Sequence, residues 1–295
     1  MLVVDKEITL LPMLIEWQKE MSRNRLKQYL QNGRIHVNGK PITRFDYALK
    51  PGDRLEIGSA SSRKSELNNK YLRMVYEDKY LVVIEKREGI LSMATSHHAF
   101  CVKTVLDNYF ERNHLRCHAH LVHRLDRDTS GLMIFAKSRE VQQLFEADWK
   151  GLVYDRRYVA VAKGRMENES GTVSNWLKDN KQYFTYSSEV DNGGKWAVTH
   201  YRVLDYGKVN TLVELRLDTG RKNQIRVHLS DLRHPVLGDR KYGGMPDNAG
   251  EDETLAPRLC LHAYRLHFRH PVTGDDMAFD TPIPTLFQSL LDTEG

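Results

Sequence analysis

The chain has 295 residues, of which 40% are hydrophobic and 28% charged, and its formal net charge is +5. These values are typical of a globular protein rather than a disordered or membrane protein. The apolar runs are much shorter than the roughly 18 residues of a membrane-spanning helix, so we expect no membrane span. The chain starts without a secretory signal pattern, and its three cysteines lack metal-type spacing, so we expect a cytoplasmic protein.

The first predicted functional element is a basic helix followed by a hairpin. Ser22 can cap this helix and Gly33 can end it, while Asn38-Gly39 predicts a tight turn between two short strands. A solvated surface helix would also be basic, but the concentration of charge here favours contacts with RNA phosphates. The residues that we expect to make these contacts are Arg23, Arg25, Lys27, Arg34 and Lys40.

This segment resembles the small RNA-binding domain of ribosomal small-subunit protein four. The likeness rests on residues 22–27 and 32–40. The chain departs from that family before the helix, where it reads Thr9-Leu10-Leu11-Pro12 instead of an Arg-Leu-Asp start. The resemblance implies that residues 1–58 form an RNA-binding domain.

A second domain is predicted to follow a linker. Residues 59–70 are small and polar without an apolar period, which is typical of a linker, and residues 71–295 form the rest of the chain. Within 74–84 the pattern predicts two strands joined by an acidic turn, and a helix is predicted over 102–110. Cys117, His118 and His120 lie close together, but their spacing does not match a closed zinc site, so we expect no metal.

A dense polar stretch, His123–Gly131, precedes an apolar run that is typical of a buried strand. It contains two carboxylates, Asp126 and Asp128, together with two arginines. Such a stretch is either an ordinary polar turn or a site at the edge of a sheet. The residue types alone do not distinguish between these alternatives or between the two aspartates.

The following elements predict a mixed sheet. Ser138 can cap a helix that ends at Gly151, and a strand is predicted over 154–164, where Tyr158 could simply be core packing. We expect a polar excursion over 165–198, strands over 200–204 and 211–217, and a hairpin formed by 258–263 and 266–274. Strands that recur without regular helices between them predict an α+β fold rather than a doubly wound parallel sheet.

A second polar stretch, Thr219–Leu229, predicts a helix that begins at Lys222. Gly220 would lie at its start, where backbone N–H groups can bind an anion. The alternative is a basic helix start whose arginines, Arg221 and Arg226, are merely solvated.

Taken together, these motifs resemble the RluA-type pseudouridine synthases. The signature is His123-Arg124-Leu125-Asp126-x-x-Thr129-Ser130-Gly131, and further matching stretches follow in the same order as in that family. They are Tyr76–Asp78, Tyr158–Val161, Thr219–His228, His234–Asp239 and Leu261–Ala263. The resemblance covers residues 72 to about 290. It implies the pseudouridine synthase fold, a mixed, mainly antiparallel sheet with flanking helices.

The resemblance also implies a reaction and the residues that carry it. Pseudouridylation breaks the bond between ribose C1′ and uracil N1 and rejoins the base through C5, so no cofactor is expected. Asp126 would be the catalytic aspartate, Arg226 its partner, and Tyr158 the residue that stacks on the base. Asp126 could act as a nucleophile or as a base, and Asp128 would have a supporting role. Arg124 and Arg221 are further expected RNA contacts.

We therefore expect a monomeric RNA pseudouridine synthase whose substrate is a structured RNA, ribosomal rather than transfer RNA. The alternative is a non-catalytic RNA-binding or ribosome-assembly protein on the same fold. A glycoside hydrolase would need a second carboxylate across the cleft, for which Asp128 is the obvious candidate. Two departures from the family pattern, at 86–89 and at Lys222-Asn223, bear on RNA contacts more than on activity.

Overall fold

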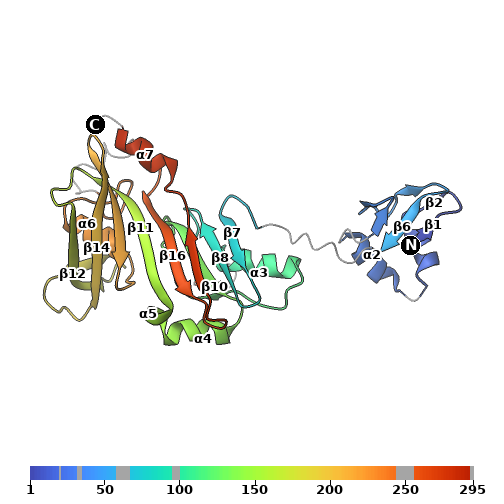
Figure 1. Cartoon of the computed structure of the whole chain (residues 1–295), viewed down its shortest axis with the longest axis horizontal. Helices are drawn as coiled ribbons and strands as arrows, with labels where there is room; N and C mark the ends of the chain where they lie inside the picture. The colour runs from blue at the N-terminus through green and yellow to red at the C-terminus, as the bar shows by residue number, and fades with distance from the viewer. Residues whose placement is uncertain (20, 32–34, 58–66, 95–99, 244–255, 293–295) are drawn as a thin grey trace. The chain divides into compact units, whose positions relative to one another are not determined.

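The computed structural model of the chain describes residues 1–19, 21–31, 35–57, 67–94, 100–243 and 256–292. It forms two compact units, Met1–Lys64 and Ser65–Gly295 (Figure 1). Their boundary falls within the predicted linker 59–70, most of which lies outside the described residues. The domain limits 1–58 and 71–295 stay predictions. In the described part of the chain, no helix is both long and apolar enough to cross a membrane.

Within its described residues, the first unit contains two helices and small sheets. One sheet has the strand order β1-β6-β3-β4, and β2 pairs with β5. The elements are β1 (Leu2–Val3), β2 (Ile8–Thr9), α1 (Leu10–Trp17), α2 (Arg23–Gln31), β3 (Ile35–Val37), β4 (Lys40–Pro41), β5 (Ala48–Leu49) and β6 (Arg54–Ile57). The buried side chains of α1 and α2 share one apolar cluster with those of the strands.

The predicted helix and hairpin are present in this unit. The Ser22 hydroxyl accepts a hydrogen bond from the backbone N–H of Arg25, as expected of a helix cap. Asn38 and Gly39 both have positive φ, which the tight hairpin turn requires. Helix α1 was not predicted. Its Pro12 lies in the first turn, where backbone N–H groups have no partner within the helix, so proline is tolerated there.

The second unit is built on one large sheet with the order β13-β12-β14-β15-β11-β16-β10-β8-β7, to which β17 and β9 are attached. Its strands are β7 (Leu72–Glu77), β8 (Leu81–Lys86), β9 (His120–Leu121), β10 (Ser130–Ala136), β11 (Val153–Lys163), β12 (Ser170–Asp179), β13 (Thr185–Ser188), β14 (Lys195–Tyr206), β15 (Asn210–Leu217), β16 (Leu261–Arg269) and β17 (Asp276–Asp280). Its helices are α3 (Val102–Arg112), α4 (Arg139–Ala147), α5 (Trp149–Leu152), α6 (Gln224–Asp231) and α7 (Thr285–Asp292). Among the described strands, β10 and β16 pair in parallel and the other pairs are antiparallel, which confirms the predicted α+β fold with a mixed, mainly antiparallel sheet.

Side chains of the central strands alternate between two apolar layers. On β8, Ile84 packs in the layer that also contains Phe110 of α3 and Ile225 of α6. Its neighbour Val83 packs in the opposite layer with Phe145 of α4. The two-residue period of a strand therefore places α4 on one face of the sheet and α3 and α6 on the other.

Two predictions about this sheet were wrong. Residues 165–198, expected to be a polar excursion, contain β12, β13 and the start of β14. These strands were missed because one of their faces is largely solvated, so their apolar content is low. Residues 258–274 do not form a hairpin of their own, because β16 is one strand and its antiparallel partner is β17.

The parallel contact between β10 and β16 allows only glycine at position 131. Gly131 has a φ of +120°, and an added Cβ atom would lie 2.2 Å from the backbone oxygen of Ala263. We expect Gly131→Ala to lower the free energy of unfolding by about 3 kcal/mol or more, since backbone strain and overpacking add. Gly274→Ala is the matched control, because Gly274 also has a positive φ but its Cβ would meet open space. Equal urea midpoints for the two variants would contradict this prediction.

Candidate active site

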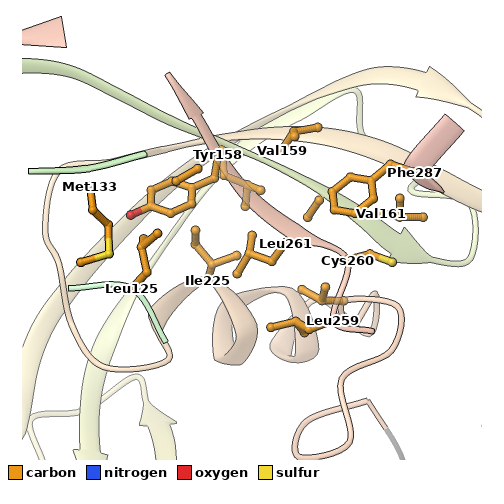
Figure 2. Close-up of a cluster of buried hydrophobic side chains, with 14 of the residues drawn as sticks. Leu125, Met133, Tyr158, Val159, Val161, Ile225, Leu259, Cys260, Leu261 and Phe287 are labelled. Carbon is orange, nitrogen blue, oxygen red and sulfur yellow. The ribbon is translucent and has the colours of Figure 1, made fainter. Parts of the chain in front are cut away.

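Three side chains that are far apart in the sequence line one cleft of about 50 Å³: Asp126, Tyr158 and Arg226. Asp126 lies in the loop before β10, Tyr158 lies on β11, and Arg226 lies on α6. Tyr158 is buried, and Figure 2 shows its ring among apolar side chains that include Leu125 and Ile225. The cleft therefore combines a carboxylate and a guanidinium with an apolar, aromatic wall.

Arg226 interacts with two carboxylates at different distances. Its Nη1 lies 3.5 Å from Oδ2 of Asp126. Its Nε and Nη2 donate hydrogen bonds of 2.7 Å to the two carboxylate oxygens of Asp239, whose side chain is fully buried. Burial lowers the pKa of Arg226, but the hydrogen bonds and charge of Asp239, followed by the charge of Asp126, raise it above its ordinary value. Arg226 is therefore a fixed cation that is held mainly by Asp239.

The loop that carries Asp126 is held on both sides by buried polar groups. The Lys86 ammonium donates hydrogen bonds to the carbonyl oxygens of Arg127 and Thr129, both at 2.8 Å. On the other side, the Ser92 hydroxyl donates to the carbonyl oxygen of Leu125 at 2.6 Å. These bonds fix the backbone immediately before and after Asp126, so its carboxylate is presented to the cleft from a rigid loop.

Burial lowers the pKa of Lys86 to about 8, although the carboxylates of Asp128, Asp126 and Glu88 favour its charged form. Its hydrogen bonds to backbone carbonyls favour the ammonium as well. Lys86 thus supplies a positive charge next to the Asp126 loop, while its donors are occupied by carbonyl oxygens of that loop and of Arg87.

The start of α6 differs from the prediction by two residues. The helix begins at Gln224 instead of Lys222, because Asn223 adopts the left-handed conformation with φ 54°. In this position the Asn223 side chain accepts a hydrogen bond from Nη1 of Arg226. The expected anion site at Gly220 is also altered, since the N–H of Arg221 donates to the side chain of Gln224.

Comparison with known proteins identifies the family. The family model for RNA pseudouridylate synthase matches residues 80–231. The chain belongs to this family. The S4 domain model matches residues 19–55, which confirms the resemblance of the first unit to the RNA-binding domain of ribosomal small-subunit protein four. The reaction of the family makes the chain an RNA pseudouridine synthase, an isomerase.

Relatives of this synthase cover most of its length. It is 35% identical over 275 residues to ribosomal large subunit pseudouridine synthase D of Vibrio parahaemolyticus, a match that covers 90% of this chain and 84% of that protein. It is also 35% identical over 268 residues to an uncharacterised RNA pseudouridine synthase of Bacillus subtilis, with 89% and 91% covered. The structure of human RNA pseudouridylate synthase domain containing 4 matches with 25% identity and a TM-score of 0.59, covering 74% of this chain and 91% of that one.

Two of the predicted RNA contacts lie at the cleft. Arg124 and Arg221 line it and are exposed. The remaining predicted contacts belong to the first unit, where Arg23, Arg25 and Lys27 are exposed on α2 and Lys40 is exposed on β4, whereas Arg34 lies outside the described residues.

Asp128, the second aspartate of the signature, does not line the cleft. Asp128 accepts hydrogen bonds from the Arg127 side chain, and 43% of its own side chain is exposed. In the described part of the chain, no three His, Cys, Asp or Glu side chains are grouped so that they could hold a metal ion.

The sequence analysis missed three residues that shape this site: Lys86, Asn223 and Asp239. Asp239 was included in a family-like motif, but nothing in the local pattern connected it with Arg226. Lys86 was noted only as the first residue of the stretch 86–89, and Asn223 only as part of the departure from the family pattern at Lys222-Asn223. The sequence of a single chain gives no sign that Lys86, at the end of a strand, is buried.

Buried histidines next to the site make the stability of the synthase dependent on pH. The ring nitrogens of His262 lie 2.8 Å from Ser130 Oγ and 2.9 Å from Thr281 Oγ1. Burial, with a smaller contribution from the charge of Arg258, lowers the pKa of His262 from 6.5 to about 3. The folded protein therefore keeps this ring neutral, whereas the unfolded chain takes up a proton below about pH 6.5, so stability is lost as the pH falls through that value.

We expect a decrease in pH from 7.5 to 5.0 to reduce the free energy of unfolding by about 2 kcal/mol through His262 alone. Urea titrations of the wild type and of His262→Gln at both pH values, followed by tryptophan fluorescence, measure this contribution as the difference between the two pH dependences. The variant His262→Gln should show a smaller pH dependence. His118→Gln is the control, since the side chain of His118 is 81% exposed. The same pH dependence in wild type and His262→Gln would refute the assignment.

Proposed function

We propose that this synthase isomerises a uridine of ribosomal large-subunit RNA and that Asp126 is its catalytic carboxylate. The meeting of Asp126, Arg226 and Tyr158 in one cleft supports the catalytic role. The ribosomal substrate is supported by the name of the Vibrio relative, a ribosomal large subunit pseudouridine synthase, and by the S4 domain. We also propose that the protein acts as a monomer in the cytoplasm.

In the proposed reaction, the bond between C1′ and N1 of the target uridine breaks and a bond between C1′ and C5 forms. The proton on C5 leaves, and N1 gains a proton, so the product is an isomer of the substrate. Asp126 acts either as a nucleophile at C1′ or as the base that removes a ribose proton, and both roles need an ionised carboxylate. The fixed cation of Arg226 lies 3.5 Å from that carboxylate.

Tyr158 is proposed to stack on the uracil ring while the base turns. The uridine has to leave its RNA stack to reach this ring, which costs roughly a few kcal/mol. Ala160 and Ala162 share a face of β11 with Tyr158 and have small side chains, so no bulky side chain follows the Tyr158 ring on that face. Arg124 and Arg221 at the cleft would bind phosphates beside the flipped nucleotide. The basic face of α2 would add affinity that does not depend on sequence.

Mapping of pseudouridine in total RNA tests the substrate. Cells that lack this gene should lose pseudouridine at a site in large-subunit ribosomal RNA and should regain it with the wild-type gene. Loss in transfer RNA alone would refute the ribosomal substrate. Unchanged modification in every RNA would favour the alternative, a non-catalytic RNA-binding or ribosome-assembly protein.

A further inference from the structure

An exposed tyrosine occupies an unusual backbone position near the cleft. Tyr183, in the turn between β12 and β13, is 75% exposed and has a φ of 59°. The turn is well defined, because the side-chain oxygen of Asn180 accepts hydrogen bonds from the N–H groups of Gln182 and Phe184. Glycine or asparagine adopts this left-handed conformation more readily than an aromatic residue. Tyr183 is therefore unusual in two respects: its aromatic ring is exposed to solvent, and its backbone adopts a conformation that aromatic residues rarely adopt.

Two lysine side chains converge on the same turn. Lys222 and Lys241 both donate hydrogen bonds to the carbonyl oxygen of Tyr183, at 3.2 and 2.9 Å. The Lys222 ammonium also pairs with Asp179 at 2.8 Å. An ammonium has three donors, so both lysines retain capacity for an additional acceptor. With two cations and one carboxylate, this turn attracts anions.

The turn is connected to the catalytic cleft through side chains in contact. Phe184 packs against Tyr242 with ring centroids 4.7 Å apart, and the Tyr242 hydroxyl accepts a hydrogen bond from Asn223, which lines the cleft. The Arg226 guanidinium lies 5.0 Å from the centre of the Tyr242 ring. Lys222 is the chain neighbour of both Arg221 and Asn223, which also line the cleft. The exposed turn is thus linked to the cleft lining by direct contacts.

We propose that Tyr183, Phe184, Lys222 and Lys241, named here the Tyr183 surface, bind an unpaired nucleotide of the RNA substrate next to the target uridine. The Tyr183 ring stacks on the base of this nucleotide, and the two ammonium groups bind its phosphate. An exposed aromatic ring beside cations is the arrangement by which proteins bind unpaired nucleotides. An acidic polypeptide would also be attracted by the lysines, but it has no base to stack on Tyr183. This inference rests on the proposed function, because it assumes an RNA substrate.

The test compares variants of the full chain in two assays. The first measures affinity for a fluorescein-labelled 12-nucleotide oligouridylate by anisotropy. The second measures KM and kcat on an unmodified transcript of the host's large-subunit ribosomal RNA. Tyr183→Asn removes the ring but keeps a residue that tolerates the turn conformation. It should weaken oligouridylate binding about tenfold and raise KM with little change in kcat. Tyr183→Phe should behave like the wild type in both assays.

The lysines and a matched control complete the test. Lys241→Gln should weaken oligouridylate binding and lower the slope of log affinity against log salt by about one. Tyr154→Asn is the control, since Tyr154 is also an exposed tyrosine, 52% exposed at the start of β11, and does not line the cleft. It should leave both assays unchanged.

Two results would overturn the Tyr183 surface. One is an unchanged affinity for oligouridylate in Tyr183→Asn, and the other is an equal loss of affinity for polyglutamate, which would assign the surface to an acidic polypeptide. A failure of the proposed function is a separate result. In that case, wild-type protein would make no pseudouridine in the ribosomal transcript, whereas Tyr183→Asn would still lose oligouridylate binding.

Discussion

Replacing Asp126 with asparagine is expected to lower pseudouridine formation by at least about 1000-fold. Asparagine has nearly the same shape as aspartate but carries no negative charge, so it can act neither as a nucleophile at C1′ nor as a base. The loop around position 126 is held through backbone groups bonded to Lys86 and Ser92, which this change leaves in place. RNA affinity should therefore persist. Single-turnover formation of pseudouridine in the ribosomal transcript, with a parallel binding measurement, gives both values.

Asp128→Asn is the matched control for this experiment. Asp128 is two residues away and also carries a carboxylate, but its side chain pairs with Arg127 and is 43% exposed. Exposed pairs of this kind contribute little, so the variant should retain activity within a few-fold of the wild type. Equal loss of activity in both variants, or full activity in Asp126→Asn, would remove Asp126 from the role proposed here.

Asp239→Asn is expected to have the second largest effect, on stability and on catalysis together. The fully buried Asp239 carboxylate holds Arg226 with two hydrogen bonds of 2.7 Å. Removal of one partner from a buried ion pair typically costs about 3 to 5 kcal/mol, and we expect a decrease of about 3 kcal/mol in the free energy of unfolding. Asp276→Asn is the control, since Asp276 pairs with Arg269 at the surface and its side chain is 68% exposed.

The catalytic effect of Asp239→Asn has its own readout. Among the described residues, Asp126 would then be the carboxylate left within 4.0 Å of Arg226, so the guanidinium would interact more strongly with it. A carboxylate whose oxygen atoms are occupied by the guanidinium is less able to react with the ribose. We expect kcat to fall about 100-fold with little change in KM. A kcat equal to that of Asp276→Asn would mean that Asp239 acts only by supporting the fold.

The limits of the sequence analysis follow from the range of the interactions involved. Asn38-Gly39 predicted its hairpin correctly because a tight turn depends on the φ preferences of two adjacent residues. The strands β12 and β13 were missed because half-solvated strands carry a weak apolar signal, and their pairing with β14 is not visible locally. The expected hairpin at 258–274 failed for a related reason. The partners of β16 include β10 and β11, which lie far before it in the chain: Ser130 pairs with His262, and Ala160 with Leu261.

The sequence by itself determined the fold class, the family and the candidate residues Asp126, Tyr158 and Arg226, because short motifs and strand periods are local properties. Only the tertiary structure decided how Arg226 is shared between Asp126 and Asp239. It also decided that the turn carrying Tyr183 is linked to the cleft lining, because Phe184 packs against Tyr242 and Tyr242 is hydrogen-bonded to Asn223. These arrangements depend on the order and register of the strands, which bring distant parts of the chain within contact distance and leave no periodic signal in the sequence.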